Sequence, residues 1–210
     1  FYNYFNSYNF HNLYKELLNF CTVDLSAFYF DIRKDCLYCD PIVSKKREGC
    51  IITLNIILES LLKWFAPILS FTTEEIYGLI NDGKKSIHLE KFLSIPQKLC
   101  NEKLNEKWAE LKKIRDVCNV SIETKRASKE IGSSLEANLT ISLKKDMMKF
   151  VKGVDLSELC ITSEVKIIES QKEDDIKVST TKAEGNKCPV CWKISKNECE
   201  RDHCGKRSIS

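Results

Sequence analysis

A chain of 210 residues can hold one large domain or a medium-sized domain with appendages. Its apolar content of 43% suffices for an ordinary core, and its net charge of +3 is too weakly basic to require or to exclude a nucleic-acid partner. The longest apolar run, residues 51–71, contains polar residues and a proline, which excludes a membrane span and indicates a buried core helix. The sequence starts at Phe1 with no initiator methionine, signal or transit segment, so we expect a piece of a longer polypeptide.

Residues 1–100 are expected to form a helical bundle. Apolar side chains recur at three- and four-residue steps over Phe10–Phe20, as on one face of an amphipathic helix. A second helical stretch follows from about Val23, until Asp40-Pro41 interrupts it. The segment Ile51–Phe65 is apolar on almost every side, which predicts a helix inside the bundle.

A capping motif predicts where the next helix begins. Thr72 is the expected N-cap, with Glu75 at the third helical position, which together form a capping box. Phe71 and Ile76 stand at the positions of a hydrophobic staple. The turn-forming residues 81–83 are expected to close this short helix.

Residues 101–178 are expected to form a long helix and a small α+β unit. The helix should run from about Asn101 to Glu130, with Gly132 as its stop. From Asn138 to Lys144 apolar and polar residues alternate, which is the period of a half-buried strand. The remaining expected elements are a short helix over residues 146–151 and short strands over residues 159–162, 164–168 and 176–178.

Residues 179–210 form a cysteine-rich tail, because four of the eleven cysteines crowd into the last 23 residues. Two residues separate Cys188 from Cys191, a spacing that lets two thiolates bind one tetrahedral zinc ion. Cys199 and Cys204 follow, with His203 between them, so both a four-cysteine and a three-cysteine-one-histidine site are possible. The alternative is a redox pair, but the strand-to-helix context of such motifs is missing here. We predict a closed, structural zinc site.

Basic charge is concentrated in this tail. From Ser179 onward there are seven Lys/Arg and four Asp/Glu, so the tail carries an excess of three positive charges, equal to that of the whole chain. Trp192 could stack on a base or cover the metal turn. A second CxxC pair, Cys36 and Cys39, lies in a helical stretch without a matching pair nearby, and we expect core or incidental cysteines there.

Four segments, taken in order, resemble the C-terminal part of class I isoleucyl-tRNA synthetases of the bacterial type. One of them is similar to a stretch shared with the valine and leucine enzymes, whereas the last two are particular to the isoleucine enzyme. The resemblance covers nearly the whole chain. The segments are residues 19–29 with 34–38, residues 66–72 with 74–76, Arg126 and Lys129 with residues 131–137 (IGSSLEA), and residues 183–192 (AEGNKCPVCW).

The resemblance implies an α-helical anticodon-binding domain over residues 1–100, truncated at its N-terminus, followed by a C-terminal extension and a zinc tail. The implied partners are isoleucine tRNA and absent N-terminal catalytic and editing domains, in the cytoplasm. ATP and Mg²⁺ would act only in that absent catalytic domain, because the family's His-x-Gly-His and Lys-Met-Ser-Lys-Ser signatures do not occur here. The chain alone is therefore expected to be inactive, although its parent is a ligase.

RNA contacts are expected from basic and aromatic residues, since phosphate contacts spread over many Lys and Arg side chains. For each of them the alternative is an ordinary solvated surface residue. The candidates are Lys34, Arg47, Lys125, Arg126, Lys129, Trp192, Lys193 and Arg207.

The sequence departs from the family pattern in two places. Arg207 occupies the last ligand position of the family's second CxxC, and arginine stays protonated, so Cys199, His203 or solvent must supply the fourth ligand beside Cys188, Cys191 and Cys204. Arg47 is followed by Glu48 where the family has two arginines. A stand-alone RNA-binding module and a zinc-stabilised protein–protein adaptor, both derived from a synthetase, are the alternative functions.

Overall fold

The computed structural model describes residues 1–94, 96, 99–170, 176–199, 201 and 204. The chain divides into two compact units. Unit 1 contains Phe1–Leu37 and Ile42–Leu99, and unit 2 contains Tyr38–Pro41 and Cys100–Ser210. As expected, the described chain is mainly helical, with a small α+β unit and a cysteine cluster near its C-terminal end. The expected boundary at residue 178, which would make the tail a domain of its own, stays a prediction.

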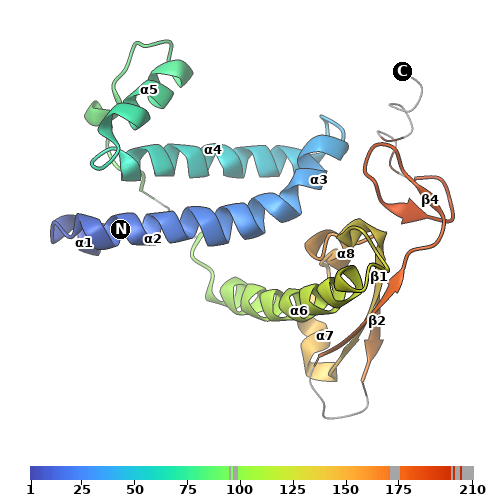
Figure 1. Ribbon diagram of the computed structural model, residues 1–210. Helices are drawn as coiled ribbons and strands as arrows, with labels where there is room; N and C mark the ends of the chain where they lie inside the picture. The colour runs from blue at the N-terminus through green and yellow to red at the C-terminus, as the bar shows by residue number, and fades with distance from the viewer. Residues whose placement is uncertain (95, 97–98, 171–175, 200, 202–203, 205–210) are drawn as a thin grey trace. The chain divides into compact units, whose positions relative to one another are not determined.

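Unit 1 starts with helical segments that follow one another almost without interruption (Figure 1). The helix α2 begins where Asn9 Oδ1 accepts a hydrogen bond from Asn12 N at 3.3 Å, and it buries the predicted stripe residues Leu13 and Leu17. The helical stretch expected from about Val23 is present, and its first part is a π-helix, η1. The segments are α1 (Tyr2–Asn6), α2 (Phe10–Asn19), η1 (Phe20–Phe30) and α3 (Asp31–Cys39).

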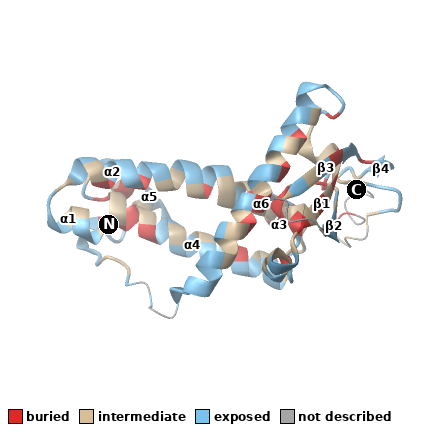
Figure 2. Ribbon diagram, turned by 90° about the horizontal axis from the view of Figure 1, so that it is seen from below, coloured by how far each residue is buried: buried red, intermediate tan, exposed pale blue. Residues whose placement is uncertain are grey.

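The helix α4 (Lys45–Phe65) is more exposed than its sequence predicts. It starts at Ser44, whose Oγ accepts a hydrogen bond from Arg47 N. Ile52 and Ile56 are 53% and 44% exposed, so the prediction of a helix buried all round is wrong for the described residues (Figure 2). The sequence of a uniformly apolar helix does not show which face is buried. The elements packed against the helix determine that face. The buried residues of α4 are Cys50, Ser60, Leu62 and Lys63.

The helix α5 (Ser70–Ile80) does not use the predicted capping box. Its N-cap is Leu69, because the chain continues from α4 through a turn whose Leu69 carbonyl already accepts the Thr73 N–H at 3.0 Å. Phe71 is 93% exposed and therefore makes no staple. The helix ends at Asn81 as expected, and a short 3₁₀ turn, η2 (Ile87–Leu89), follows it.

Unit 2 is built on the long helix α6 (Glu102–Ala127). Asn101 Oδ1 caps it by accepting a hydrogen bond from Leu104 N at 3.1 Å, as expected for an Asn N-cap. The helix ends three residues before the expected Glu130. Lys129 takes the left-handed conformation (φ +59°) that ends such helices, in place of Gly132.

A three-stranded sheet of order β2-β1-β3 packs on α6 (Figure 1). The central strand β1 (Ala137–Leu143) alternates buried and half-buried residues, which confirms the period-two pattern. It pairs in parallel with β2 (Glu164–Glu169) and antiparallel with β3 (Lys177–Lys182). Ser121 of α6 and Thr180 of β3 share a hydrogen bond of 2.6 Å between their hydroxyls. The buried core of this unit contains Leu111, Ile114, Cys118, Ile122, Leu139, Ile141 and Leu143.

The connection from β1 to β2 carries short helices. The predicted strand over residues 159–162 is wrong, since α8 (Leu156–Leu159) covers its first residue. Asp155 Oδ1 caps this helix by accepting hydrogen bonds from the backbone N–H groups of Ser157 and Glu158, a local cap that the apolar pattern hides. The other elements are η4 (Ser134–Glu136), η5 (Lys145–Met147) and α7 (Met148–Val151) before α8, and β4 (Asn186–Lys187) and β5 (Ile194–Ser195) in the tail. Among the described residues, no helix combines the length and apolar content needed to cross a membrane.

Candidate functional site

The CxxC motif lies in a turn between the two short antiparallel strands β4 and β5. Cys188 N donates to Lys193 O at 2.9 Å and Trp192 N donates to Cys188 O at 3.0 Å, which closes the turn around the first cysteine. Trp192 has a φ of +64°, and Gly185, at the base of the hairpin, has a φ of +127°. A turn of this kind directs both thiols to one side, as a metal-binding pair requires.

Four thiols converge beside this turn. The sulfurs of Cys188, Cys191, Cys199 and Cys204 all lie within 4.8 Å of one another, and the Sγ atoms of Cys191 and Cys199 are 3.8 Å apart. A tetrahedral zinc site with Zn–S bonds of about 2.3 Å requires sulfurs separated by about 3.8 Å. The donor set therefore fits a closed four-thiolate zinc site, with Cys199 in the place that the sequence left open. His203 lies outside the described residues.

The surroundings of the thiols favour one thiolate and oppose others. Burial raises the pKa of the Cys188 thiol, but hydrogen bonds from the backbone N–H groups of Cys191 and Val190 and from neighbouring thiols outweigh it and lower this pKa to about 7. Burial raises the pKa of Cys191 and of Cys204, and the neighbouring sulfurs add to the rise for Cys204. Thiolates this close repel one another. A divalent cation bound between them would offset this repulsion and stabilise the deprotonated form.

Two hydrogen bonds hold the hairpin on the α+β part of unit 2. Ile194 N donates to Ser163 Oγ at 2.7 Å, and Lys193 Nζ donates to Ser157 Oγ at 3.2 Å. Lys193 is half-buried. It therefore has a structural role in the chain besides any contact with RNA.

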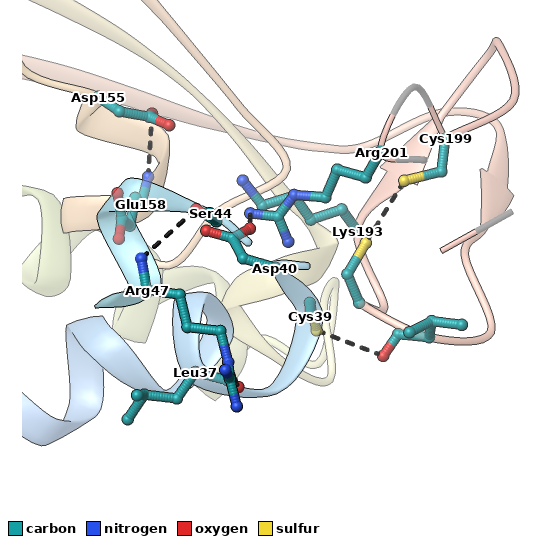
Figure 3. A network of polar contacts seen from close by, with 12 residues as sticks. Leu37, Cys39, Asp40, Ser44, Arg47, Asp155, Glu158, Lys193, Cys199 and Arg201 are labelled. Carbon is teal, nitrogen blue, oxygen red and sulfur yellow. Dashed lines mark hydrogen bonds and ion pairs between the residues drawn. The ribbon is translucent and has the colours of Figure 1, made fainter. Parts of the chain in front are cut away.

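The segment Tyr38–Pro41, which belongs to unit 2, also contacts the tail. Cys39 is buried with Cys191 and Cys204, and its thiol lies 3.9 Å from the carbonyl oxygen of Val190, to which it can donate (Figure 3). The Asp40 carboxylate pairs with Arg201 at 3.5 Å. The expectation that Cys39 is a core or incidental cysteine did not include this proximity. The second CxxC, Cys36 and Cys39, was the available sequence signal. It did not indicate contact with the tail, because Cys39 and Val190 are 151 positions apart.

A hollow of about 750 Å³ opens next to the four cysteines. Lys187 places its Nζ 5.6 Å from the centre of the Trp192 ring, and that ring is 59% exposed. This exposure leaves the ring accessible to a stacking partner. The cationic residues that line the hollow are Lys187, Lys193, Lys196 and Arg201.

Three further RNA candidates gather at the C-terminal end of α6. Lys125 pairs with Glu130 at 2.8 Å, and Arg126 pairs with Glu123 at 2.6 Å. Arg126 and Lys129 also line a hollow of about 460 Å³. A phosphate at this place would compete with two carboxylates for Lys125 and Arg126, which reduces the gain expected from either residue alone.

The other RNA candidates are spread through the chain. Lys34 pairs with Asp31 at 2.8 Å on the surface of α3. Arg47 donates from Nε to the carbonyl oxygen of Leu37 at 3.1 Å, so its guanidinium holds the connection between α3 and α4. Arg207 lies outside the described residues.

The helical unit and the long helix lie in the part of the chain that matches a known domain family. The family model of the anticodon-binding domain of tRNA ligase matches residues 1–141. The chain belongs to this family. It is 66% identical to the isoleucine–tRNA ligase of Pelagibacter ubique over 199 residues, which are 95% of this chain and 22% of that relative. It is 38% identical to the isoleucine–tRNA ligase of Bradyrhizobium diazoefficiens over 200 residues, covering 90% and 20% of the two chains. The chain thus spans about a fifth of the length of these curated relatives, and the expected likeness to the isoleucine enzyme is confirmed.

Proposed function

We propose that this chain binds the anticodon arm of isoleucine tRNA as part of an isoleucine–tRNA ligase in the cytoplasm. The carrying observation is the match of residues 1–141 to the anticodon-binding domain family, joined to 66% identity with one such ligase over 95% of the chain. ATP-dependent joining of isoleucine to the tRNA would take place in N-terminal catalytic and editing domains outside this sequence. The chain alone would bind RNA without aminoacylating it.

The four converging cysteines would hold a structural zinc ion. Zinc bound by four thiolates leaves no open position for water or substrate, so the ion would stabilise the tail and supply no catalytic chemistry. Such a centre carries a net negative charge, because four thiolates outweigh one divalent cation. Lys193 and Arg201 line the same hollow and would offset this charge.

Recognition of the RNA would combine stacking with phosphate contacts. Trp192 offers an exposed ring beside a lysine, and single-stranded bases stack well on such rings. Lys129 is exposed at the end of α6, near Arg126. Lys34, Arg47, Lys125, Lys193 and Arg207 remain proposed contacts of the phosphate backbone. Lys34, Arg47, Lys125 and Lys193 also have intramolecular partners, which predict smaller individual effects for these four.

The test is a titration of the purified chain with isoleucine tRNA and with an anticodon variant, at two salt concentrations. We expect preference for the isoleucine anticodon and an affinity that falls steeply with salt. Trp192→Gly suits the positive φ of this position and removes the ring, so it should weaken binding about tenfold without loss of metal. Lys166→Ala, an exposed residue of β2 paired with Glu164, is the matched charge control.

The metal is tested separately by its stoichiometry. The chain should contain about one zinc per molecule, and Cys199→Ser should lose it. Cys100→Ser changes an exposed thiol outside the cluster and should leave the metal content unchanged. A chain that binds zinc but not RNA would support the adaptor alternative, and equal binding of both anticodons would support a stand-alone RNA-binding module.

A further inference from the structure

We propose that Cys39 and Asp40 are positioning residues of the metal centre, which makes zinc affinity depend on a segment far upstream of the four cysteines. The inference rests on the proposed zinc site. Both residues belong to the Tyr38–Pro41 segment of unit 2, so their contacts with the tail lie within one compact unit. Neither residue is proposed as a ligand.

The site consists of two halves that must be held together. Cys188 and Cys191 come from one turn, which the β4–β5 hairpin orders. Cys199 and Cys204 come from the chain that follows the hairpin, and no described strand pairing includes them. Ligands that are already near their bound positions lose less conformational freedom when the metal binds, so whatever holds the second half beside the first raises the affinity.

The Tyr38–Pro41 segment contacts both halves. The Cys39 thiol donates to the Val190 carbonyl, between the first two cysteines, at 3.9 Å. The Asp40 carboxylate pairs with Arg201, between the last two cysteines, at 3.5 Å, and their side chains are only 14% and 29% exposed (Figure 3). A partly buried ion pair is screened less by solvent than a surface pair, so this one can fix the position of Arg201.

Cys39 also covers one side of the sulfur cluster. It is 7% exposed and packs in one cluster with Cys191 and Cys204, which are 5% and 2% exposed. Exclusion of water from this side keeps the local dielectric low and strengthens the attraction between thiolates and a cation. Two adjacent residues thus act on the centre in different ways, Cys39 through its hydrogen bond to Val190 together with packing, and Asp40 through charge.

The experiment is a competitive zinc titration of the full 210-residue chain against a chromophoric chelator. Asp40→Ala and Arg201→Ala should each weaken zinc binding about 10-fold to 100-fold while the saturated stoichiometry stays at about one, as for other residues behind metal ligands. The double variant should be no weaker than either single variant, because both remove the same ion pair. Asp40→Glu, which keeps the charge, should restore most of the affinity.

Cys39→Val tests the second contact, because it keeps the buried volume and removes the thiol donor. It should weaken zinc binding about tenfold, and the absorption of the Co²⁺-loaded variant should keep the signature of a four-thiolate site. Glu184→Gln is the matched control, since it breaks another ion pair of the same tail, Lys196–Glu184 at 2.8 Å, with both side chains at least 74% exposed. Its affinity should equal that of the unaltered chain.

The outcomes separate this inference from the proposed zinc site. An unaltered chain that binds no zinc overturns both. An unaltered chain that binds one zinc, with Asp40→Ala and Cys39→Val within twofold of it, overturns only the role of the Tyr38–Pro41 segment. A loss of affinity in Glu184→Gln equal to that in Asp40→Ala also contradicts it, because any charge change in the tail would then suffice.

Discussion

Ser163 and Ile194 connect the cysteine hairpin to the sheet. Ile194 N donates to Ser163 Oγ at 2.7 Å, and the same hydroxyl donates to the carbonyl oxygen of Leu135. The backbone N–H of Ser163 in turn donates to Ala137 O at 3.0 Å, at the start of β1. Ser163 thus joins the hairpin to residues 135–137 at the start of β1, and the hairpin is held on the sheet at this residue.

Ser163→Ala should lower the free energy of unfolding by about 1–3 kcal/mol, because it leaves two half-buried backbone groups without their partner. The measurement is urea unfolding of the metal-loaded chain. Ser142→Ala, at a half-buried position of β1, is the control and should change stability by no more than about 0.5 kcal/mol. Equal effects of the two substitutions would contradict the linking role of Ser163.

Gly185→Ala should prevent the tail from forming its hairpin. A Cβ at this position would lie 2.2 Å from the carbonyl oxygen of Ser195, and the φ of +127° is a conformation that only glycine adopts readily. We expect loss of most zinc binding in a metal-content assay, because Cys188 follows directly on the disturbed strand.

The control for this substitution is Gly49→Ala in α4. A Cβ at Gly49 meets nothing within 4 Å, and alanine is the better helix former, so this variant should gain about 0.5–1 kcal/mol of stability. Retention of the full metal content by Gly185→Ala would show that the backbone of the tail differs from the one described.

Ile141→Ala should be among the most destabilising substitutions in unit 2. Ile141 is fully buried in the central strand, so its truncation leaves a cavity and should lower the free energy of unfolding by about 2–5 kcal/mol. Ile141→Val should lower it by only about 1 kcal/mol. Ile168→Ala, at a position of β2 that is 50% exposed, should cost clearly less than Ile141→Ala in the same denaturant titration.

Glu130 should titrate below the 4.5 of an unperturbed glutamate. Its pKa is lowered by the hydrogen bond from Lys125 and next by that from Ser128. Since the folded-state pKa is depressed, the pair stabilises the fold above the unfolded-state pKa, and this contribution is lost as the pH falls through the folded-state value. An NMR titration of the Glu130 carboxyl group measures the pKa, and Lys125→Met should return it towards 4.5. An unchanged pKa in that variant would mean that the ion pair does not form in solution.

Local pattern was enough for the helices and strands whose hydrogen bonds are local or periodic. The stripe of α2, the Asn101 cap of α6 and the alternation of β1 all follow from neighbours in the sequence. The capping box at Thr72 failed because the carbonyl of Leu69, at the end of a turn from α4, had already started the helix. A capping motif therefore predicts a helix start only when the preceding residues have not already begun the helix.

The sequence by itself determined the helical class, the CxxC at Cys188 and Cys191, and the likeness to isoleucine–tRNA ligases. Only the tertiary structure decided that α4 stays partly exposed, that Cys199 completes the group of four thiols, and that Cys39 lies beside them. The physical reason is the sequence separation of the residues that interact. Helix and strand periods are fixed over a few residues, whereas the four sulfurs are brought together across turns. Cys39 reaches Val190 from 151 positions away in the sequence, a contact that no local period can predict.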